Sequence, residues 1–89
     1  MSYDDKRSGT VAAMNPVRGM VAIATEDDGY TIIELLEDWD LEPGDAITWR
    51  NGYGLGPEVY VNVSKGTRAE VYVQNHSVSQ ANLRQQLLF

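Results

Sequence analysis

Hydrophobic residues occur in short runs that turn residues interrupt roughly every eight to twelve positions, and helical spacing is almost absent. This pattern is typical of an all-β barrel or sandwich. It predicts strands over residues 9–14, 19–25, 30–36, 45–50, 58–63 and 68–74.

The turn residues divide these strands. Asn15-Pro16 ends the first strand, because proline lacks the N–H that a strand ladder needs. Asp28-Gly29 predicts a hairpin between the second and third strands. Residues 51–57 contain three glycines and are expected to form a loop.

The last two predicted strands alternate in polarity. Val59, Val61 and Val63 are expected on the buried side of the fifth strand, with Tyr60 on the other side. Placing Val61 opposite Val71 would keep like faces together, and this register needs an odd-length loop centred on Gly66.

The chain divides into a flexible N-terminus over residues 1–7, a barrel over residues 8–74 and a tail or short helix over residues 75–89. Leu83 and Leu87 lie four residues apart in the tail, which is compatible with one apolar helical stripe. A helix this short needs to dock on the barrel to be stable.

Two blocks of the chain resemble the cold-shock domain family. They carry a Gly-x-Val start, a first turn, an acidic hairpin, a Gly-Pro loop and an Asn-Val strand, at Gly9, Val11, Asn15-Pro16, Arg18-Gly19, Asp28-Gly29, Pro43-Gly44, Trp49, Gly56-Pro57 and Asn62-Val63. The resemblance covers roughly residues 8–63. It implies a small five-stranded OB-type barrel, here with an added C-terminal strand and a short tail or helix.

The chain departs from that family where the family binds single-stranded nucleic acid. Met20 and Ala22 stand where the first binding motif has aromatic residues, and the segment Ile32-Ile33-Glu34-Leu35 replaces the second motif. Because base stacking contributes about 1–3 kcal/mol per base, losing these rings removes ordinary affinity. The resemblance therefore implies the barrel without the inherited function.

The formal net charge of -6 is concentrated in one segment. Residues 26–45 hold nine of the thirteen acidic residues and no Lys or Arg. Such a segment would repel phosphate beside the third strand. It is interpreted either as a solvated loop or as a dock for a basic partner.

Aliphatic side chains occupy positions of the former nucleic-acid face, namely Met14, Met20, Ile32 and Leu35. An exposed apolar patch of this kind marks a protein contact, so the leading hypothesis is a non-enzymatic protein-interaction or self-association module. Two alternatives stay open. A register shift of one residue would place these side chains in the core, or the tail could cover them, within one chain or between two.

The competing hypothesis is weak binding of single-stranded RNA or DNA. Candidate phosphate contacts are Arg18, Arg50, Lys65 and Arg68, and candidate stacking rings are Tyr30, Trp49, Tyr53 and Tyr60.

No pattern points to catalysis, a cofactor or a metal. The chain has no cysteine, and its serines lack a nucleophile motif. Asp38, Asp40 and Glu42 alternate as calcium ligands do, but Pro43 falls where an EF-hand needs glycine. His76 lacks a second histidine as a co-ligand. No apolar run approaches the length of a membrane helix, so we expect a cytoplasmic protein with no membrane contact.

Overall fold

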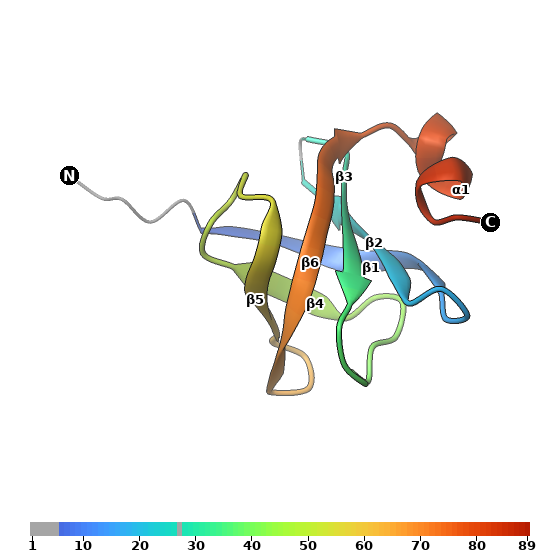
Figure 1. Cartoon of the computed structure of the whole chain (residues 1–89). Helices are drawn as coiled ribbons and strands as arrows, with labels where there is room; N and C mark the ends of the chain where they lie inside the picture. The colour runs from blue at the N-terminus through green and yellow to red at the C-terminus, as the bar shows by residue number, and fades with distance from the viewer. Residues whose placement is uncertain (1–5, 27) are drawn as a thin grey trace.

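Six antiparallel strands close into one barrel in the computed structural model, which describes residues 6–26 and 28–89 (Figure 1). The strands are β1 (Arg7–Asn15), β2 (Met20–Thr25), β3 (Tyr30–Leu35), β4 (Ala46–Trp49), β5 (Gly56–Asn62) and β6 (Thr67–Val78). A short 3-10 helix, η1 (Gln80–Asn82), leads into α1 (Leu83–Gln86). Around the barrel the order is β1-β2-β3-β6-β5-β4, with β4 paired to β1.

The predicted all-β fold class is confirmed. The added C-terminal strand is β6, which lies between β3 and β5 and so completes the barrel. It continues past residue 74, the predicted end of the barrel, to Val78. Of the N-terminal segment predicted to be flexible, residues 1–5 lie outside the described residues, and Arg7 already belongs to β1. Among the described residues, no helix has the length and apolar character needed to cross a membrane.

The hairpin predicted at Asp28-Gly29 joins β2 to β3. Gly29 has a φ of 69°, a conformation that favours glycine. Its carbonyl accepts hydrogen bonds from both the backbone N–H and the side-chain hydroxyl of Thr25, at 2.9 and 2.7 Å. These contacts fix the register in which β2 and β3 present their side chains.

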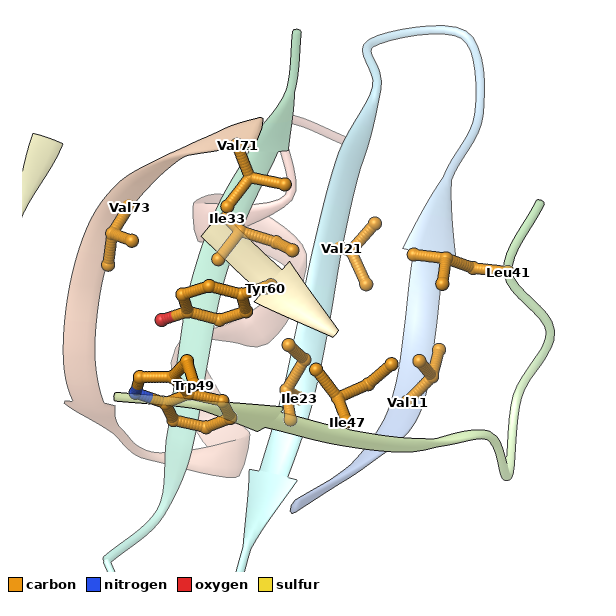
Figure 2. Packing of buried hydrophobic residues seen from close by; sticks show 10 residues of the cluster. All are labelled: Val11, Val21, Ile23, Ile33, Leu41, Ile47, Trp49, Tyr60, Val71 and Val73. Carbon is orange, nitrogen blue, oxygen red and sulfur yellow. The ribbon is translucent and has the colours of Figure 1, made fainter. Parts of the chain in front are cut away.

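The barrel interior is filled by side chains from every strand and from the segment before β4 (Figure 2). They are Val11, Val21, Ile23, Ile33, Leu41, Ile47, Trp49, Tyr60, Val71 and Val73. The Trp49 and Tyr60 rings stack with centroids 4.5 Å apart. Burial raises the pKa of the Tyr60 hydroxyl, which has no hydrogen-bond partner among the described residues.

The predicted orientation of β5 is wrong. Tyr60 and Asn62 point into the barrel, whereas Val59 and Val63 are exposed. Val61 pairs with Arg68, across an even-length connection over residues 63–66. The physical reason is the size of the Tyr60 side chain and its stacking on the Trp49 ring, because the stacked ring fills the barrel interior better than valine does.

Asn62 is held in its inward position by polar contacts. Its Nδ2 donates to the Asp45 carboxylate at 2.8 Å, and its Oδ1 accepts from the Lys65 backbone N–H at 3.0 Å. The observed register also keeps Glu70 on the exposed side of β6. With the valines of β5 inside, an even-length loop would bury Glu70, and the inverted orientation of β5 avoids this.

Candidate functional site

The outer face of β2 and β3 is apolar, as the sequence predicts. Val21, Ile23 and Ile33 point into the barrel, so the alternating residues Met20 and Ile32 point outward. A second apolar cluster forms around them, with Ala22, Val78 and Leu87 as its other buried members. This cluster lies outside the barrel wall.

The chain's own C-terminal segment, residues 79–89, covers this face (Figure 1). Leu87 is only 1% exposed, and Leu83 and Tyr30 pack against the same cluster. The prediction of an exposed apolar face is therefore wrong for Met20 and Ile32. The alternative in which the tail folds back within one chain is confirmed.

A long-range hydrogen bond anchors the C-terminal segment. The Asn15 side-chain Nδ2, at the end of β1, donates to the Leu87 carbonyl at 2.8 Å. Asn15 is itself buried, so this bond satisfies a polar group that would otherwise be costly. Leu87 thus attaches the segment through both its side chain and its backbone carbonyl, and Leu83 adds a further apolar contact.

Met14 and Leu35, the other two predicted contact residues, face inward and pack against the interior cluster. An irregularity in β1 between Val11 and Ala13 shifts the alternation by one, so that Ala13 faces the outer cluster and Met14 the interior. Leu35 follows Ile33 by two residues and shares its inward face. The expected placement of Met14 and Leu35 on the outer face is therefore wrong.

Three of the four predicted contact residues nevertheless meet in one cleft. Met14, Met20 and Leu35 line a concavity of about 460 Å³ between the β1–β2 turn and the chain that follows β3. We call this concavity the barrel-end cleft. The Leu35 backbone N–H donates to the Gly19 carbonyl at 2.8 Å and joins its two walls.

The rim of the barrel-end cleft carries exposed apolar side chains. Val17 is 91% exposed at the tip of the β1–β2 turn, and Leu36 is 50% exposed on the opposite wall. The charged residues that line the cleft are Arg18, Glu37 and Asp38. An apolar rim beside acidic groups is typical of a surface that binds another molecule.

The acidic segment is partly neutralised by one lysine from the β5–β6 connection. Lys65 Nζ lies 3.2 Å from Asp40, 2.9 Å from Glu42 and 3.5 Å from Asp45. The Glu42 carboxylate, followed by Asp40, raises the pKa of Lys65. The hydrogen bond from Asn62 is the main cause that lowers the pKa of Asp45. Lys65 is therefore held in a structural ion-pair cluster.

A second polar network fixes the glycine-rich loop over residues 51–55. The Tyr53 hydroxyl and the Ser77 hydroxyl each donate to the Asp28 carboxylate at 3.0 Å. The Tyr53 bond is the main cause that lowers the pKa of Asp28. The Arg7 guanidinium lies 4.5 Å from the centre of the Tyr53 ring and 3.5 Å from Asp28.

His76 completes this network. Its Nε2 lies 2.9 Å from the Gly54 carbonyl, which only accepts, so this nitrogen carries the proton. Its Nδ1, 2.9 Å from the Thr31 hydroxyl, then accepts in the neutral ring. Both ring nitrogens are engaged in holding the loop on β3 and β6. Among the described residues, no group of His, Cys, Asp or Glu side chains is arranged to hold a metal ion.

The structure does not bring the eight predicted nucleic-acid residues to one surface. Trp49 and Tyr60 are buried against each other, so the prediction that they supply exposed rings is wrong. The remaining residues are distributed over several places: Tyr30 lies under the C-terminal segment, Tyr53 in the loop network, Lys65 among carboxylates and Arg18 at the barrel-end cleft. Of the eight, Arg50 and Arg68 line a common surface together with the buried Trp49.

Sequence reasoning missed Val17, Leu36 and Asn15. Val17 lies in the β1–β2 turn, where no periodicity assigns a face, and Leu36, predicted as the last residue of the third strand, lies in the bend after β3. Asn15 matched the family pattern as a turn residue, and nothing in its surroundings indicated a bond to Leu87.

Comparisons with protein-family models, with curated proteins and with solved structures found no match to this chain.

Proposed function

We propose that this chain is a non-enzymatic protein-interaction module that contacts its partner through the barrel-end cleft. The observation that carries the proposal is the pair of exposed apolar side chains, Val17 and Leu36, on opposite walls of a concavity floored by Met14, Met20 and Leu35. Exposed apolar groups around a concave floor are typical of contact sites.

The charged residues that line the barrel-end cleft favour a basic partner. Glu37 and Asp38 line the cleft, belong to the acidic segment and outnumber Arg18, the one cation among the lining residues. Lys65 pairs with other acids of that segment, at Asp40, Glu42 and Asp45, and Glu37 and Asp38 have no ion pair among the described residues. A partner segment with one large apolar side chain flanked by Lys or Arg would match both features. Rim charges of this kind act on association rate and specificity more than on affinity.

The assignment as non-enzymatic rests on how the reactive side chains are used. His76 and Asp28 are committed to the loop network. Tyr60, whose pKa is raised by burial, lies inside the barrel. The cold-shock resemblance remains part of the proposal as a likeness of barrel type, and it carries no nucleic-acid site because the stacking rings are missing. A cytoplasmic location is also proposed, because a chain without cysteine needs no oxidising compartment.

The test is a peptide selection. Random peptides are selected on the immobilised barrel, with the double variant Val17→Asp/Leu36→Asp as counter-target. The expected peptides carry a large apolar residue next to Lys or Arg, and bind the double variant about tenfold more weakly or worse. A matched control is Leu55→Asp, because Leu55 is a similarly exposed side chain in the β4–β5 loop.

Two results would contradict the proposal. One is recovery of peptides that bind the wild-type chain and the double variant equally well. The other is a selection that yields only peptides sensitive to Leu55→Asp. Heteronuclear NMR spectra of each variant confirm that the barrel is intact before binding is compared.

A further inference from the structure

A second concave surface lies on β4 and β5. β5 lies on the side of the barrel away from the C-terminal segment (Figure 1). The concave surface is formed by β4 and β5, with contributions from Lys6, just before β1, and from the start of β6. Val61 pairs with Arg68 on one side and with Thr48 on the other, so these three side chains form a row across three strands. The concavity measures about 600 Å³.

Three cations surround an aliphatic floor in this concavity. Lys6, Arg50 and Arg68 line it together with Val59 and Val61, which point outward because Tyr60 points inward. No ion pair joins any of these cations to a carboxylate among residues 6–26 and 28–89. We call this set the β5 basic surface.

One carboxylate lines the same surface and is already engaged. The Glu58 Oε2 accepts a hydrogen bond from Asn51 Nδ2 at 3.0 Å. The three lining cations therefore exceed the single lining acid, on a chain whose net charge is -6. A local excess of positive charge against an acidic background favours an anionic ligand at this place.

We infer that the β5 basic surface binds an acidic segment of a partner protein that also carries aliphatic side chains. The floor favours this ligand over single-stranded nucleic acid, because Val59 and Val61 offer aliphatic contact, and Trp49, which also lines the concavity, is only 2% exposed. The rings nearest in sequence, Trp49 and Tyr60, are stacked on each other inside the barrel. Cations without a stacking platform give only weak, salt-sensitive binding to a nucleic acid strand.

A second copy of this chain is a poorer occupant. Each copy carries a net charge of -6, so two copies repel each other at long range. Three acids of a second copy, Asp40, Glu42 and Asp45, are already paired with Lys65, which leaves Glu37 and Asp38 of the barrel-end cleft as a smaller acidic group. The basic surface and the barrel-end cleft also differ in charge and position, so this inference goes beyond the proposed function.

The experiment uses a fluorescein-labelled peptide of about ten residues in which Glu alternates with Val, so that an extended chain presents one side chain type to each side. A second peptide has Ser in place of every Val, and a third ligand is a labelled oligothymidine. Fluorescence polarisation measures binding of each ligand to the intact chain at low and at moderate salt.

The variants are matched by charge and exposure. Arg50→Glu/Arg68→Glu is expected to weaken binding of the Glu–Val peptide by about tenfold or more, because two attractive charges become repulsive. Arg18→Glu/Arg84→Glu, which also reverses two exposed positive charges but away from this surface, is expected to change binding by less than about twofold. Val61→Ser is expected to weaken the Glu–Val peptide and to leave the Glu–Ser peptide almost unchanged.

Four results would overturn the inference: no binding of the Glu–Val peptide, equal binding of the Glu–Ser peptide, equal sensitivity to Arg18→Glu/Arg84→Glu, or tighter binding of oligothymidine with the same dependence on Arg50 and Arg68. Val17→Asp/Leu36→Asp should leave peptide binding at the β5 basic surface intact. A failure of the inference for the β5 basic surface and a failure of the proposed function of the barrel-end cleft are therefore distinguishable.

Discussion

Replacing Leu87 with alanine tests how the C-terminal segment is attached. Leu87 is 1% exposed and packs on Met20 and Ile32 outside the barrel wall. Burying a leucine side chain fully contributes about 1.5–3 kcal/mol, and a rigid cavity adds to the loss. The segment ends the chain with two short helices, so it can shift to close part of the cavity. We expect Leu87→Ala to lower the free energy of unfolding by about 2 kcal/mol.

The neighbouring residue supplies the control. Leu88 is 53% exposed, and Leu88→Ala removes the same atoms from a side chain that is largely in water. It should change the free energy of unfolding by less than about 0.5 kcal/mol. Urea unfolding followed by tryptophan fluorescence and circular dichroism measures both variants. Equal losses for Leu87→Ala and Leu88→Ala would refute the packing of Leu87 on β2 and β3.

Two further changes address the interior and the polar contacts. Tyr60→Phe removes a buried hydroxyl that has no partner among the described residues, so the melting temperature should stay the same or rise, and a clear fall would contradict this reading. The pKa values of Asp28 and Asp45 lie below their ordinary 3.8 because Tyr53 and Asn62 donate to the carboxylates. Their stabilising effect is therefore present above about pH 3.8 and is lost as the pH falls through the folded-state pKa. Melting temperatures from pH 6 to pH 2 should fall less steeply in Asp28→Asn/Asp45→Asn than in wild type. Equal slopes would show that these carboxylates do not contribute to the pH dependence of stability.

The strands could be predicted from the sequence because their signals are local. Alternation and the Asp28-Gly29 turn located β2 and β3, and their pairing follows from the turn. Alternation divides a strand into two faces without saying which one is inside. In β5 the choice between valines and Tyr60 was decided by Trp49, a tertiary partner that no local pattern reveals.

The candidate site was predicted in part for the same reason. Met20 and Ile32 were correctly placed on one outer face, and the Leu83–Leu87 spacing allowed a covering tail. The irregularity in β1, which turned Met14 inward, has no signature in its alanine-rich sequence. The sequence predicts Lys65 as a phosphate contact, because its three carboxylate partners lie at least twenty residues earlier and no local pattern reveals them.

The most direct test of the barrel-end cleft is a methyl NMR titration of the intact chain with a peptide recovered in the selection. We expect shifts at Val17, Leu36 and Met14, which line the cleft, and none at Ile32 or Leu87, which belong to the cluster packed between the C-terminal segment and β2 and β3. Shifts at Ile32 and Leu87 without shifts at Val17 and Leu36 would contradict this expectation. That result would mean that the partner displaces the C-terminal segment and binds the outer face of β2 and β3.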